Sequence, residues 1–170
     1  PLSDYGRLEG LDGIEVMNTG AFPNGDASGL PLGELLRAGQ RVLPIGGDDN
    51  HNDHGFADSF GGFTYILSDK LDYQSIINSL DNGDLYCSTG PQLFEVSVDS
   101  DNLHIKTSNA VQITVLTENG KAFSAKAKPH EAVTEFECKI NDFGDFFVVY
   151  VKDENGNHAM TRAFYKGEDY

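Results

Sequence analysis

The sequence predicts an α/β segment over residues 1–90 followed by an all-β segment over residues 91–170. In the first ninety residues, short apolar runs alternate with stretches of helical spacing, in the order β-α-β-β-α-β. After Gly90-Pro91 the helical spacing disappears and short alternating runs recur, which is typical of antiparallel strands. This change of pattern places a domain boundary near residue 90.

The elements of the first segment follow from its apolar spacing. Strands are expected at residues 13–17, 41–45, 63–67 and 85–88, and helices at residues 31–38 and 71–80. Ser68 and Asp69 are candidate caps for the second helix, and Gly83 is expected to end it in the left-handed conformation. Because strands alternate with helices, the segment predicts a mainly parallel sheet.

The second segment is expected to form a small antiparallel β-sandwich. Six strands are expected, at residues 94–98, 103–107, 111–117, 134–140, 146–151 and 159–165. Asn119-Gly120 and Asn155-Gly156 lie between such runs. They predict hairpins, because both central positions of the tightest hairpin turn favour Asn and Gly.

Composition narrows the classes of function. The formal charge of -15, from 27 acidic and 12 basic residues, repels nucleic-acid phosphates and anionic membrane surfaces and suits cations. No window reaches the roughly 18 consecutive apolar residues of a membrane-spanning helix. Cys87 and Cys138 are interpreted as free, buried thiols, although one disulfide between them stays open. A soluble, cytoplasmic protein is expected.

The residues with the clearest potential for chemistry lie in Gly46-Gly47-Asp48-Asp49-Asn50-His51-Asn52-Asp53-His54, directly after the apolar run 41–45. Parallel sheets and barrels keep their sites at the carboxyl ends of strands. Asp49 and His51 have a spacing that lets both side chains point to the same side of an extended segment. Carboxylate oxygen together with imidazole nitrogen suits Zn, Mn or Fe.

Two alternatives compete for this segment. One is a solvated acidic loop in which Asp and Asn cap turns and the His are incidental. The other is a calcium loop, but its sixth residue is Asp53 instead of Gly, and its twelfth is Ser59 instead of Glu. His54 is a possible further ligand or substrate contact, although its direction on an irregular loop is not predicted. His104, His130 and His158 are interpreted as surface residues.

Three motifs follow one another in the first segment. They are, in order, Asp12-Gly13-Ile14-Glu15-Val16-Met17-Asn18, the segment from Gly46 to Asn52, and Tyr86-Cys87-Ser88-Thr89-Gly90-Pro91. In their order and rough spacing they resemble the late part of PHP (polymerase and histidinol phosphatase) metallohydrolases, most closely the CehA/McbA-like branch. The resemblance implies that residues 1–90 are the carboxy-terminal part of a distorted PHP β/α barrel, with the β-sandwich of residues 91–170 appended.

The resemblance also implies roles for individual residues. Asp49 and His51 match the family's final Asp-x-His metal motif, and Glu15 and Asn18 match a strand-end motif near the site. Family members usually bind two or three Zn, Mn or Fe ions, which activate water for attack on a phosphoester or another ester. The family's earlier His and acidic ligands have no counterpart here, because no His precedes His51.

The missing ligands imply that an N-terminal part of the same barrel is a partner of this chain and that the chain alone is inactive. The opening at Pro1, with neither an initiator Met nor a signal peptide, is interpreted as a cut in a longer protein. Self-association through open strand edges is a further hypothesis. The competing hypothesis is a non-catalytic module whose β-sandwich recognises a saccharide or a protein.

Overall fold

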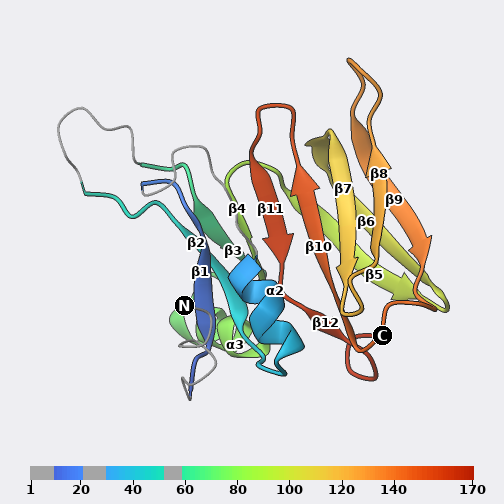
Figure 1. The fold of residues 1–170 in the computed structure, drawn as a ribbon. Coiled ribbons are helices and arrows are strands. Elements are labelled where there is room, and N and C mark those ends of the chain that lie inside the picture. The colour runs from blue at the N-terminus through green and yellow to red at the C-terminus, as the bar shows by residue number, and fades with distance from the viewer. Residues whose placement is uncertain (1–9, 21–29, 52–58) are drawn as a thin grey trace. The chain divides into compact units, whose positions relative to one another are not determined.

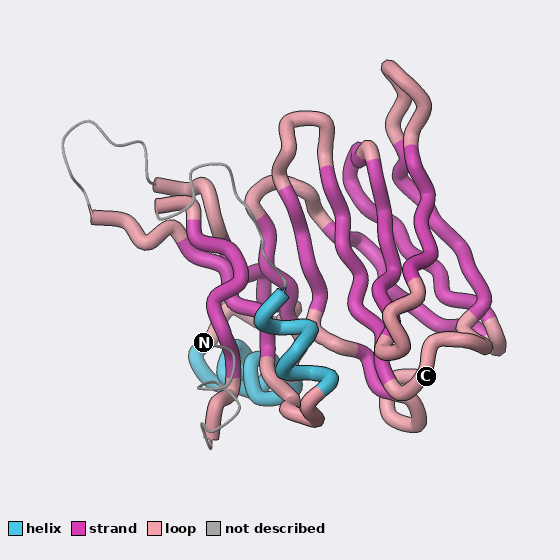
Figure 2. Tube along the Cα trace, viewed as in Figure 1, coloured by secondary structure: helices cyan, strands magenta, loops and turns pink. Residues whose placement is uncertain are grey.

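The computed structural model describes residues 10–20, 30–51 and 59–170 and divides the chain into two compact units, Pro1–Thr89 and Gly90–Tyr170. The described residues are mostly β, and their only helices lie in the first unit (Figures 1 and 2). None of these helices is long and apolar enough to cross a membrane. The predicted change from mixed to all-β structure near residue 90 agrees with this distribution of elements.

The first unit contains four strands and two helices within its described residues. They are β1 (Gly13–Asn18), α2 (Leu30–Arg37), β2 (Leu43–Gly47), β3 (Phe63–Ile66), α3 (Tyr73–Asn82) and β4 (Leu85–Ser88). β1 and β2 are parallel, as the sequence predicts, and a bulge between Glu15 and Met17 shifts their register. α2 buries Leu32, Leu35 and Leu36, whose spacing puts them on one helical face.

The prediction of a mainly parallel sheet is wrong for β3 and β4, which pair antiparallel. The amide of Leu67, just after β3, donates to the carbonyl of Asp84, just before β4, with an N···O distance of 2.8 Å. The end of β3 and the start of β4 are therefore neighbours, and α3 does not carry the chain back along the sheet as a parallel crossover requires. The described strands form no closed barrel.

Helix α3 begins later than the sequence predicts. Its N-cap is Asp72, whose Oδ1 accepts a hydrogen bond from the amide of Ser75 at 2.9 Å. Ser68, a predicted cap, instead donates to the carbonyl of Lys70. The predicted end is confirmed, because Gly83 has φ 73° and its amide donates to the carbonyl of Leu80.

The second unit is built from two sets of antiparallel strands, as the alternating pattern predicts. In one, β6 (Asn102–Ala110) lies between β5 (Leu93–Asp99) and β9 (Val133–Lys139). The other set has the order β11-β10-β7-β8, with β12 also paired to β10. Its members are β7 (Gln112–Thr117), β8 (Ala122–Lys126), β10 (Phe146–Lys152), β11 (His158–Thr161) and β12 (Phe164–Tyr165).

The core of the second unit receives side chains from both sets of strands. Leu103 and Ile105 of β6, and Val115 of β7 with Val149 of β10, are all buried. β6 contacts β10, and β9 contacts β7 and β8. These contacts place the alternating apolar faces of the two sets against each other, which is how antiparallel sheets with one wet face bury the other.

Two differences from prediction have local causes. Strand β8 is absent from the predicted elements, because Ala and Ser are poor strand formers and dominate Ala-Phe-Ser-Ala-Lys. The predicted strand at 159–165 divides into β11 and β12 after Thr161. The Thr161 hydroxyl accepts from the amide of Val149 and donates to the carbonyl of Arg162, which interrupts the regular strand pairing.

Both Asn-Gly pairs form hairpins, but the turns are longer than the two-residue type. The amide of Thr117 donates to the carbonyl of Lys121 and that of Asp153 to Asn157, so each loop contains three residues between the bonded pair. Gly120 and Gly156 have φ of 78° and 85°. Three-residue hairpins need a left-handed residue at this point, and glycine adopts it without strain.

Candidate functional site

The carboxyl ends of β1 and β2 lie at the same edge of the parallel pair and are joined there to the start of β3. Asn18 is opposite Gly47 in the register, and the pairing continues beyond the strands, where the amide of Gly20 donates to the carbonyl of Asp48 at 2.7 Å. The hydroxyl of Thr64 on β3 accepts from the amide of Gly46 and donates to its carbonyl. Three strands therefore position the residues that follow Gly47.

Two glycines permit the close approach of β2 and the chain before β3. A Cβ on Gly62 would lie 2.5 Å from the carbonyl oxygen of Gly47, and one on Gly46 would lie 2.8 Å from that of Phe63. Both distances are too short for any side chain, and the atoms approached belong to the backbone. Glycine is therefore required at both positions.

Asp48 lies at the centre of this junction and binds both neighbouring segments. Its Oδ1 accepts hydrogen bonds from the amides of Gly61 (2.8 Å) and Gly62 (2.6 Å) and from the hydroxyl of Thr19 (3.0 Å), and its Oδ2 accepts from the amide of Phe60. Burial acts to raise the pKa of Asp48, but these hydrogen bonds outweigh it and hold the pKa below the usual 3.8. The carboxylate is ionised at neutral pH.

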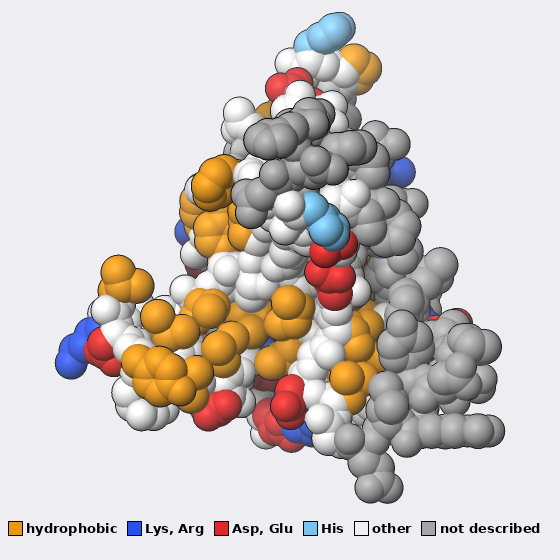
Figure 3. All heavy atoms as spheres, turned by 90° about the vertical axis from the view of Figure 1, so that its left-hand side faces the viewer, with side chains coloured by type: hydrophobic (Ala, Val, Ile, Leu, Met, Phe, Trp, Pro, Cys, Tyr) orange, Lys and Arg blue, Asp and Glu red, His pale blue; other side chains and the backbone are white. Residues whose placement is uncertain are grey.

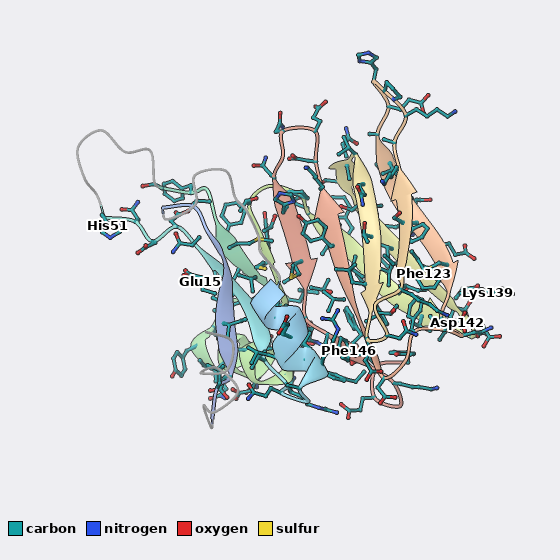
Figure 4. All side chains as sticks on the ribbon, in the orientation of Figure 1. Glu15, His51, Phe123, Lys139, Asp142 and Phe146 are labelled. Atoms are coloured by element: carbon teal, nitrogen blue, oxygen red, sulfur yellow. The ribbon has the colours of Figure 1, made fainter. Side chains whose placement is uncertain are left out.

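The predicted ligand pair, Asp49 and His51, is brought together just beyond Asp48. The Asp49 Oδ1 and His51 Nε2 atoms are 3.9 Å apart, and the two side chains are 48% and 70% exposed. Figure 4 shows His51 beyond the strand ends, and Figure 3 shows a histidine beside acidic side chains on this face. Asp49 has φ 52°, the left-handed conformation, which turns the chain away from β2.

Glu15 and Asn18, the second predicted motif, are close to each other on β1. The Asn18 Nδ2 donates to Glu15 Oε2 at 3.1 Å, and a Cβ on Gly47 would lie 3.6 Å from Glu15 Oε1. In Figure 4 Glu15 lies within β1, and His51 lies beyond the strand ends. Within residues 10–20, 30–51 and 59–170, no three His, Cys, Asp or Glu side chains form a group that could hold a metal ion.

His54 lies outside the described residues. Of the three histidines interpreted as surface residues, His158 is different, because it is buried at 9% exposure and its Nδ1 is hydrogen-bonded to the hydroxyl of Tyr150. His130 is exposed, and His104 lies 3.5 Å from the Glu137 carboxylate across β6 and β9. Cys87 is free and buried as predicted, and Cys138 is free but only partly buried.

Sequence reasoning missed the role of Asp48. From the sequence, Asp48 and Asn50 are members of the Gly46–His54 segment with no role of their own. In the structure both Asp48 carboxylate oxygens already accept hydrogen bonds, and the side-chain amide of Asn50 donates to the hydroxyl of Ser59. The available signal was the Gly61-Gly62 pair, whose backbone amides are accessible to a carboxylate.

The chemistry of Asp49 and His51 suits a metal ion that has further ligands. Two ligand atoms about 2.1 Å from a tetrahedral zinc are about 3.4 Å apart, so the 3.9 Å separation needs only a small side-chain adjustment. Two protein ligands alone do not make a structural or catalytic site, which need four and three protein ligands respectively. Comparisons of the chain with protein-family models, with curated proteins and with solved structures find no match.

Proposed function

We propose that the chain is the carboxy-terminal part of a PHP-type metal-dependent hydrolase, with Asp49 and His51 as two ligands of its metal site. The observation that carries the proposal is the pair itself, 3.9 Å apart at the carboxyl edge of the parallel strands β1 and β2. The three motifs that resemble the CehA/McbA-like branch support it. The antiparallel second unit suits the β-sandwich of that branch.

In this proposal the remaining ligands come from an N-terminal part of the same barrel. A Zn, Mn or Fe ion held by the completed ligand set would supply the activation of water for hydrolysis of a small phosphoester or another ester. Asp49 and His51 supply one carboxylate oxygen and one imidazole nitrogen from an exposed position. Glu15 and Asn18 are polar side chains on the strand below and are candidates for orienting substrate or a ligand.

The proposal has consequences for partners and location. The chain alone is without hydrolase activity, because two ligands leave the metal site incomplete. Nucleic acid and membranes are not substrates or partners, in keeping with the charge of -15. A cytoplasmic location and self-association through open strand edges stay predictions.

Metal binding by the chain tests the ligand pair directly. Zn²⁺ affinity is measured by competition with a chromophoric chelator, for the unsubstituted chain and for Asp49→Asn and His51→Gln. Each substitution removes one of two ligands, so the affinity should fall at least about tenfold. In the full-length protein the same substitutions should lower metal content and hydrolysis of p-nitrophenyl esters together.

A second acid–histidine pair in the chain provides the matched control. His104 and Glu137 are 3.5 Å apart on β6 and β9, away from any end of a parallel pair. His104→Gln and Glu137→Gln should leave the Zn²⁺ affinity unchanged. Equal losses at both pairs would show non-specific binding to the acidic surface, and no loss at Asp49 and His51 would reject the assignment in favour of a non-catalytic module.

A further inference from the structure

The loop that carries Asp49 and His51 is closed at its base by side chains. Asp48, at one end, accepts from the amides of Phe60, Gly61 and Gly62 at the other end. Two residues after Asp48, the side-chain amide of Asn50 donates to the hydroxyl of Ser59. Asp49 lies between these two connections, and His51 follows the second.

The backbone of Asp48 is held as firmly as its carboxylate. Its carbonyl accepts from the amide of Gly20, and the preceding carbonyl, of Gly47, accepts from the amide of Thr19 at 3.3 Å. The Thr19 hydroxyl donates to Asp48 Oδ1, so the residues after β1 contact both the main chain and the side chain of Asp48. One residue thus connects the ends of β1 and β2 with the start of β3.

We propose that Asp48 is a positioning residue, whose carboxylate closes the base of this loop and thereby sets the separation of the Asp49 and His51 side chains. The inference rests on the proposed function for its consequence in metal binding. The geometry of the loop itself does not depend on the proposed function. The four donors named above engage both Asp48 oxygens, so the carboxylate is already occupied in holding the loop.

Substitution by Asn tests the charge and the acceptor pattern at almost unchanged volume. The Asn amide has one acceptor oxygen and one NH₂ group that only donates. Whichever way it is oriented, the NH₂ group faces either the amide of Phe60 or the three donors at Oδ1, so at least one donor of the loop base loses its acceptor. Asp48 acts on the two ligands through the loop backbone and not through a direct hydrogen bond. We therefore expect the Zn²⁺ affinity of Asp48→Asn to fall about tenfold, the lower end of the loss seen when a direct hydrogen-bond partner of a metal ligand is removed.

A readout without metal separates positioning from general stability. In Asp48→Asn, exchange of the Gly61 and Gly62 amides should accelerate, and the NMR order parameters of Asp49 and His51 should fall. Amides of the buried strand residues Val149 and Val151 in the second unit should keep their protection. Unchanged order at Asp49 and His51 would overturn the inference, whatever the metal affinity.

Thr19 offers a milder test that does not remove the carboxylate. Thr19→Val deletes one hydroxyl donor to Asp48 Oδ1 at equal volume, and Thr19→Ser keeps the donor. We expect Thr19→Val to change loop order and Zn²⁺ affinity in the same direction as Asp48→Asn but less, and Thr19→Ser to restore both. If Asp48→Asn does not fold, this pair decides the inference, and identical behaviour of Val and Ser would overturn it.

Asp153 is the matched control, because it has the same chemistry in another loop. Its Oδ1 accepts from the amides of Asn155 (2.9 Å) and Asn157 (2.8 Å) in the β10–β11 hairpin. Asp153→Asn should loosen that hairpin and leave Asp49, His51 and the Zn²⁺ affinity unchanged. If the full-length protein binds no Zn²⁺, the proposed function fails, and the order parameters still decide the role of Asp48.

Discussion

Replacement of Gly62 by Ala should destabilise the first unit far more than the addition of one methyl group suggests. The new Cβ would lie 2.5 Å from the Gly47 carbonyl oxygen, and real Cβ contacts are not shorter than 3.0 Å. The backbone must therefore separate by at least 0.5 Å (3.0 minus 2.5) between the end of β2 and the start of β3. Because both atoms are constrained by backbone geometry, no side-chain rotation relieves the clash.

The cost follows from the bonds at this junction. The Gly62 amide donates to Asp48 at 2.6 Å and the Gly61 amide at 2.8 Å, and a shift of this size weakens both. A hydrogen bond to a charged group contributes about 1.5–3 kcal/mol, so Gly62→Ala should lower the free energy of unfolding of the first unit by about 2–4 kcal/mol. The assay is urea unfolding, monitored through the hydrogen exchange of the β1 and β2 backbone amides.

Gly33 in α2 is the control for the same substitution. A Cβ there would meet nothing closer than Arg37 Nη1 at 3.6 Å, an ordinary contact. Alanine in a helix interior is favoured over glycine by about 0.5–1 kcal/mol, so Gly33→Ala should stabilise the unit. A Gly62→Ala variant within about 0.5 kcal/mol of the unsubstituted chain would refute the reasoning about backbone contact.

Two further predictions concern the second unit. Phe147 is buried against the rings of Phe143, Phe164 and Tyr170, with centroid distances of 5.0–5.2 Å. Phe147→Ala should therefore lower the free energy of unfolding, measured with urea, by about 3–5 kcal/mol. A loss below about 1 kcal/mol would contradict the assigned packing. Burial, and secondarily the charge of Glu137, raises the pKa of the Cys138 thiol from 9.0 to about 11. Because the thiolate is the reactive form, alkylation of Cys138 by iodoacetamide at pH 8 should be about 100-fold slower than that of a thiol of ordinary pKa. The rate, measured by mass spectrometry, should keep rising up to about pH 11; a plateau near pH 9 would contradict it.

Local patterns were enough to predict most elements of both units. The parallel pairing of β1 and β2, the end of α3 at Gly83 and the two Asn-Gly hairpins follow from residues that are neighbours in the chain. The antiparallel pairing of β3 with β4 was not predictable in this way. It depends on where α3 directs the chain, which the apolar pattern of the helix does not specify.

The candidate site shows the same division. Sequence alone determined that Asp49 and His51 follow a buried strand with a spacing that suits one metal ion, because strand, turn and ligand preference are properties of adjacent residues. Only the tertiary structure decided that Asp48 is engaged by Thr19 and by Phe60–Gly62, residues 12 to 29 positions away. A carboxylate can accept from backbone amides as well as bind a metal ion, and the close approach of three strand ends puts the amides of Phe60, Gly61 and Gly62 against Asp48.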